Sequence, residues 1–196
     1  MWRRQARGRI GSPVLLYAFP EIGLSIEIGS TMTIEDTSLR SHLLDLLRGS
    51  GAHVDVLSAL AGLPPHLRGK RPPGAPHSAW ELLEHIRFTL HDLLDYCVNP
   101  HYREPAWPRD YWPHSAELAT DLATDQDWCE SVRALEADLA EFERLIRNPR
   151  TDLFAAIPWA KAGHTPLREV LLAADHTSYH TGELVYLRRL LGAWKG

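Results

Sequence analysis

The chain has 196 residues, 44% of them hydrophobic and 23% charged, with a formal net charge of −4 at pH 7. These values are typical of one globular domain with a hydrophobic core. The negative charge and the lack of a long basic run argue against nucleic-acid binding, and no stretch approaches the roughly 20 apolar residues of a membrane-spanning helix. Cys97 and Cys129 are too few for a disulfide framework or a thiolate zinc site, which favours a reducing cytoplasm.

Residues 1–31 differ in character from the rest of the chain. Arginines near the start precede a short apolar run, Val14 to Phe19, which superficially resembles a signal peptide. The run is shorter than a usual signal sequence core, is stopped by Pro20-Glu21, and is followed by no clear small-residue cleavage site. We therefore expect no export, and we expect residues 1–31 to be an extension outside a core domain at 32–196.

The first predicted helix runs from about Ser38 to Ala61, because apolar residues recur there at the spacing of a buried helical stripe. Gly49-Ser50-Gly51 interrupts the stripe, and two glycines inside a helix cost roughly 1 kcal/mol each relative to alanine, so a bend is expected. His53 falls one turn further along the same stripe. It is a candidate for substrate contact, with an ordinary core or boundary histidine as the alternative.

The second predicted helix covers residues 78–98. It follows a proline-rich stretch, 62–77, that is expected to be a long surface connection without regular structure. Ser78 and Glu81 have the spacing of a capping box, which marks a helix start. His85 lies at the edge of the apolar stripe of this helix, in a mixed polar setting that is typical of a pocket wall.

Two further helices are predicted in the second half of the chain. Residues 100–114 form an aromatic and proline-rich connection, which either covers a site or caps the end of a bundle. A third helix is expected at about 115–147, with a break allowed near 124–127. The fourth begins at a Thr-Pro helix-start signal and runs to Leu191, where Gly192 stops it.

His176 and His180 are the most informative residues of the chain. An i, i+4 pair lies on one face of a helix, so both imidazoles can reach one metal ion. They occupy seam positions where leucine is expected, and a metal ion satisfies buried imidazole nitrogens. A chance pair of hydrogen-bonded core histidines is the alternative. The residue after the first histidine is Thr177 rather than a glutamate, which excludes the zinc-protease motif.

Four amphipathic helices without convincing strand patterns predict an all-α fold, a four-helix bundle with long proline-rich connections. Metal sites in such bundles are built in the interior from side chains on facing helices. A histidine on the second helix, His85, could therefore complete the pair on the last helix.

Three segments in this order resemble the DinB/YfiT-like superfamily. They are WELLEHI around His85, HTSYHTGEL from His176, and LRRLLG ending at Gly192. The likeness covers residues 32–196. It implies a four-helix bundle, often dimeric, in which three histidines hold a divalent metal, and the motifs place these ligands at His85, His176 and His180.

The donor set is compatible with several metals. Three imidazoles with open positions are typical of a catalytic metal site, and they suit zinc, nickel, iron and manganese without selecting strongly among them. Two positions depart from the usual family pattern, Thr181 where arginine is common and Glu183 where glutamine is common. Neither departure changes the ligands.

The resemblance implies a metal-dependent enzyme, because some relatives are thiol transferases that use low-molecular-weight thiols and others are hydrolases or isomerases. A metal-activated thiol or water acting on a small-molecule substrate is the leading hypothesis. Asp92, Tyr179 and Glu183 are candidates for a general base or for substrate contact, with a surface or ligand-orienting role as the alternative. Two other hypotheses remain open: a non-catalytic metal-binding or stress-associated protein, and a structural bundle whose histidines are core hydrogen-bonders.

Overall fold

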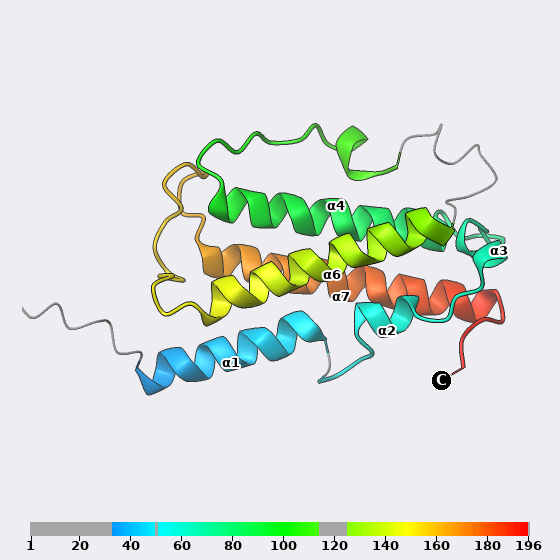
Figure 1. Ribbon diagram of the computed structural model, residues 1–196, viewed down its shortest axis with the longest axis horizontal. Coiled ribbons are helices and arrows are strands. Elements are labelled where there is room, and N and C mark those ends of the chain that lie inside the picture. Colours follow the sequence, from blue (N-terminus) through cyan, green and yellow to red (C-terminus); the bar gives the residue numbers. More distant parts are fainter. Residues whose placement is uncertain (1–32, 50, 114–124, 196) are drawn as a thin grey trace, which may run out of the picture.

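The computed structural model describes residues 33–49, 51–113 and 125–195, and every regular element within them is a helix (Figure 1). The long helices are α1 (Ile34–Arg48), α4 (Ala79–Val98), α6 (Asp125–Arg147) and α7 (Pro166–Leu190). Three short elements lie between them: α2 (Val56–Leu60), α3 (Pro65–Arg68) and the 3-10 helix η1 (Arg109–Tyr111). The predicted all-α fold is confirmed.

The long helices form a bundle whose order in space differs from their order in the chain. α4 packs against α6 and α7, and α1 packs against the same two helices from the other side. α4 and α6 run in one direction and α1 and α7 in the other (Figure 1). This arrangement requires the chain to return after α4, and the segment that carries η1 runs back along that helix. None of the described helices combines the length and apolar character that a membrane crossing requires.

The first predicted helix was wrong in extent, because α1 ends at Arg48 instead of bending and continuing to Ala61. Gly49 adopts φ 68°, a left-handed conformation that ends a helix, and its N–H donates to the Asp45 and Leu46 carbonyls. The chain then restarts at α2, where the Asp55 side chain accepts from the Ser58 N–H. The glycine-containing stretch is therefore a stop between two helices.

The connection at 62–77 was expected to lack regular structure, but it contains α3. Pro65 occupies the first turn of this short helix, where a missing N–H costs nothing. Arg68 at its end pairs with Asp125 at 2.7 Å, and its guanidinium lies 4.8 Å from the ring centre of Trp128 on α6. This contact fixes the connection to the end of the bundle.

The starts of α4 and α7 agree with the prediction. Ser78 and Glu81 form both bonds of the capping box, and Thr165 caps α7 ahead of its proline. Gly192 has φ 68° just beyond the end of α7, as expected of a helix stop. The predicted third helix is present as α6, which is continuous from Asp125 to Arg147, and its predicted part at 115–124 lies outside the described residues.

The core lies between the four long helices, and two buried arginines fasten its edges. Fully buried side chains from α4, α6 and α7 meet at its centre, among them Leu83, Ile86, Phe142, Ile146, Val170 and Leu184. Arg40 of α1 donates to the carbonyls of Ile146, Asn148 and Thr151, where α6 ends. Arg188 of α7 donates to the carbonyls of Ala59 and Ala61 at the C-terminal end of α2. These bonds satisfy carbonyls that a helix end leaves unpaired.

Candidate metal centre

The structure brings the three predicted ligands together at the interface of α4 and α7. One ligand atom from each of His85, His176 and His180 lies within 4.8 Å of the other two. The Nε2 atoms of His85 and His176 are 3.1 Å apart. Because His176 and His180 are one turn apart on α7 and His85 faces them from α4, the cluster follows directly from the packing of these two helices.

His85 is held in the tautomer that a metal ligand needs. Its ring is 2% exposed, and its Nδ1 lies 2.8 Å from the carbonyl oxygen of Tyr111 in η1. A carbonyl only accepts hydrogen bonds, so Nδ1 carries the proton and Nε2 keeps its lone pair. The returning segment after α4 therefore orients the histidine that α4 contributes.

His180 has a partner of the same kind from its own helix. Its Nδ1 lies 2.6 Å from a carboxylate oxygen of Glu183, one turn further along α7. The carboxylate fixes the proton on Nδ1 and leaves Nε2 as a donor for a metal ion. A carboxylate behind a ligand histidine is a common arrangement in metalloproteins, where it orients the ring and raises its basicity.

Electrostatics keep two of these imidazoles neutral. Burial lowers the pKa of His85, partly opposed by its bond to the Tyr111 carbonyl. Burial also lowers the pKa of His176 to about 3, and the neighbouring His180 and His85 act in the same direction. Metal ions bind the neutral form of histidine. His85 and His176 therefore offer a metal ion neutral rings, and the Nδ1 partners of His85 and His180 leave the Nε2 atoms of these two residues as donors.

A tryptophan forms a wall of the site. Trp112 stacks on His85 with ring centres 3.9 Å apart and planes 2° apart, and on its other side lies His77 at 4.0 Å. The aromatic connection thus covers the histidine cluster, which was one of its two predicted roles. His77 was not predicted, because it lies outside any helix, and only the route of the chain before α4 brings it to Trp112.

Asp92 lies two turns beyond His85 on α4 and binds the same connection. Its carboxylate accepts from the hydroxyl of Tyr102 at 2.8 Å and from that of Tyr111 at 2.6 Å. Burial and these bonds raise the pKa of both tyrosines. Because Tyr111 also supplies the carbonyl that orients His85, Asp92 acts on the cluster through this residue.

The remaining candidate residues lie at the edge of the site or elsewhere. The Tyr179 side chain is 64% exposed, and its ring centre is 4.9 Å from that of His180 in an edge-on contact. His53 lies beside a different face of α7, where its Nε2 is 2.8 Å from the Ser178 hydroxyl and its Nδ1 is 2.8 Å from the Val54 carbonyl. The structure does not bring His53 into the three-histidine cluster.

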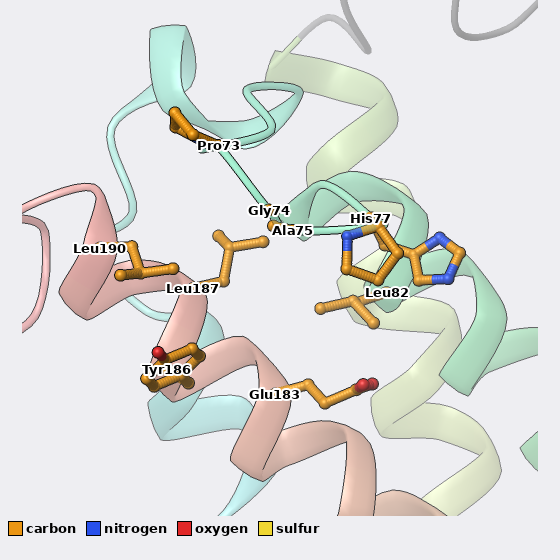
Figure 2. A pocket seen from close by; sticks show the side chains of 10 residues that line it. Pro73, Gly74, Ala75, His77, Leu82, Glu183, Tyr186, Leu187 and Leu190 are labelled. Atoms are coloured by element: carbon orange, nitrogen blue, oxygen red, sulfur yellow. The ribbon is translucent and has the colours of Figure 1, made fainter.

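A cavity of about 400 Å³ adjoins the cluster, between the 73–77 loop and the C-terminal half of α7 (Figure 2). His77 and Glu183 line it, and each also contacts the histidine site, through Trp112 and His180 respectively. Most of the other lining side chains are apolar. No sequence signal indicated this cavity, because a loop and a helix distant in the chain form it together.

Comparison with known proteins agrees with this geometry. The family model of the DinB superfamily matches residues 50–184, a range that contains all three histidines. A search of curated proteins gives no match. A search of solved structures gives none either. The match spans more than half of the chain, and the helical bundle agrees with the all-α fold of this family, so the chain belongs to the DinB superfamily.

Proposed function

We propose that this protein is a metal-dependent enzyme that activates a small-molecule thiol or a water molecule for transfer or hydrolysis. The supporting observation is the histidine cluster: three imidazoles converge, and in His85 and His180 the Nδ1 atom is bonded to an acceptor, so that Nε2 keeps its lone pair and faces the cluster. A divalent ion held by His85, His176 and His180 would supply Lewis acidity, which lowers the pKa of an adjacent thiol or water. Zinc, nickel, iron and manganese all suit this donor set.

The residues around the ligands have distinct proposed roles. Glu183 orients His180 and keeps its proton on Nδ1, and Tyr111 does the same for His85. Asp92 is committed to two tyrosine hydroxyls, so we assign it a positioning role rather than that of a general base. Tyr179 is exposed beside His180, which leaves its hydroxyl accessible for substrate contact. Trp112 excludes water from one face of His85.

The setting of the reaction is part of the proposal. The net charge of −4 gives no electrostatic attraction for nucleic acid, which supports a small-molecule substrate. The two cysteines are free and one of them is buried, as expected in a reducing cytoplasm. A homodimer is the assembly implied by the family resemblance.

Cobalt substitution tests the proposal with a readout that does not depend on knowing the substrate. Protein loaded with Co²⁺ is titrated with cysteine and with glutathione while its absorption spectrum is recorded. We expect a sulfur-to-cobalt charge-transfer band, because an open position beside three imidazoles admits a thiol. Turnover is then measured with 1-chloro-2,4-dinitrobenzene for thiol transfer and with p-nitrophenyl acetate for hydrolysis. Bound cobalt with neither a band nor turnover would favour the non-catalytic metal-binding alternative.

A further inference from the structure

The cavity beside the histidine cluster has one polar end and one apolar end. Glu183 and His77 lie at the polar end, and Leu190, Tyr186 and Pro73 lie at the other (Figure 2). Leu187 lies between the two ends, and Leu82 lies beside His77. At about 400 Å³ the cavity falls within the size range of small-molecule pockets, and such pockets are mostly apolar with a few placed polar groups.

The register of the two helices sets this cavity one turn from the proposed metal ligands. Leu82 precedes His85 by three residues on α4, and Glu183 follows His180 by three residues on α7. Residues three apart are neighbours on a helix surface. The polar end of the cavity therefore lies next to the histidines, and its apolar end points away from them along α7.

The charges around the cavity select against an anion. Glu183 is the only carboxylate among the described lining residues, and none of these residues is a lysine or arginine. An anionic group placed among these lining residues would lose water without gaining a cationic side chain as a partner, and it would be repelled by Glu183. An uncharged apolar group would lose water at no such cost.

We propose that this cavity is the substrate pocket and that it takes the uncharged apolar part of a small molecule, such as an alkyl or aryl group, while the reacting end of that molecule lies toward the histidine cluster. This inference rests on the proposed function, because it assigns the substrate class of the same site. It also gives Leu190 and Ala75 a role in specificity, since both line the cavity without contacting the ligands.

A matched pair of fluorescent probes tests the pocket separately from the metal. N-phenyl-1-naphthylamine is uncharged, and 8-anilino-1-naphthalenesulfonate has the same aromatic body with a sulfonate added. We expect the uncharged probe to bind saturably and the sulfonate to bind about tenfold more weakly, because of the missing cationic partner. Equal affinity for the two probes would overturn the proposed charge selection.

Three variants locate the binding. Ala75→Trp fills the cavity, and Leu190→Glu places a charge at its apolar end. Leu46→Glu on α1 is the control, since Leu46 is 52% exposed and Leu190 is 49% exposed. We expect the two cavity variants to weaken the uncharged probe by about tenfold or more and the control to leave it unchanged. Unchanged binding in both cavity variants, with wild-type circular dichroism, would overturn the assignment.

The proximity of pocket and metal ligands is tested by paramagnetic relaxation of the probe protons in Co²⁺-loaded protein. We expect enhanced relaxation of the bound uncharged probe, and its absence would overturn the placement of the pocket beside the histidines. Metal content is measured in the same samples. Wild-type protein that binds the probe but no divalent ion would contradict the proposed function and support the pocket. Protein that binds the ion but not the probe would contradict the pocket and leave the proposed function standing.

Discussion

Replacement of Glu183 by glutamine should weaken metal binding through His180. The carboxylate lies 2.6 Å from Nδ1 of His180, the distance of a charge-assisted hydrogen bond, and glutamine keeps an acceptor there while removing the charge. Loss of such a partner typically costs 10- to 100-fold in metal affinity, about 1.4–2.7 kcal/mol. The Glu183 side chain is 34% exposed, so solvent screens the interaction, and we expect roughly a 10- to 30-fold loss.

The assay is a competition titration of Zn²⁺ between the protein and a chromophoric chelator, with the dissociation constant as the readout. Glu136→Gln on α6 is the matched control, because Glu136 is exposed and lies outside the histidine cluster. Its dissociation constant should equal that of the wild type. If Glu183→Gln also binds with wild-type affinity, the charge of the carboxylate does not tune His180, and the reasoning that it raises the basicity of this ring is wrong.

Three further predictions concern the bundle and its cysteines. Arg40→Met leaves the carbonyls at the end of α6 without their donor, so the free energy of unfolding, measured by urea denaturation, should fall by about 3 kcal/mol. A fall of less than about 1 kcal/mol would mean that water replaces the guanidinium. Ser78→Ala removes the capping box of α4 and should lower the free energy of unfolding by about 1 kcal/mol in the same measurement. An unchanged free energy of unfolding would show that the cap is dispensable. Burial and Glu169 raise the pKa of Cys97 to about 12, so iodoacetamide at about pH 8 should label exposed Cys129 in folded protein and spare Cys97, with mass spectrometry as the readout.

The Cys97 thiol also predicts how stability depends on pH. Its pKa is raised in the folded protein from an ordinary value of 9.0, so the unfolded chain loses this proton first as the pH rises. The contribution of the protonated, buried Cys97 thiol to stability is therefore complete below about pH 9 and is lost toward pH 12. The free energy of unfolding should fall more steeply over this range in the wild type than in Cys97→Ala, and parallel curves would contradict the buried thiol.

Local signals in the sequence were sufficient for two of the long helices. The capping box at Ser78 and the Thr165-Pro166 start act within one turn, so their positions can be read without knowing the fold. The first helix could not be placed in this way. Leu57 and Leu60 continue the apolar stripe of α1 beyond Gly49, and periodicity alone does not distinguish one bent helix from two.

The histidine cluster was predictable in part, because some of its contacts lie within one helix turn. His176 and His180 share a helix face by spacing alone, and the contact of Glu183 with His180 follows from the same helical geometry. The bond from His85 to Tyr111 was not predictable, because a backbone carbonyl leaves no mark in the sequence. The placement of Trp112 between two histidines likewise depends on the route of a connection with irregular structure.

Metal stoichiometry tests the central claim most directly. Tag-free protein is reconstituted with Zn²⁺, dialysed and subjected to elemental analysis, with His85→Ala, His176→Ala and His180→Ala beside the wild type. His42→Ala on exposed α1 surface is the control. We predict about one ion per chain in the wild type and the control, and a large loss in each ligand variant with unchanged helicity by circular dichroism. Wild-type metal content in the ligand variants, or no metal in the wild type, would contradict the three-histidine centre.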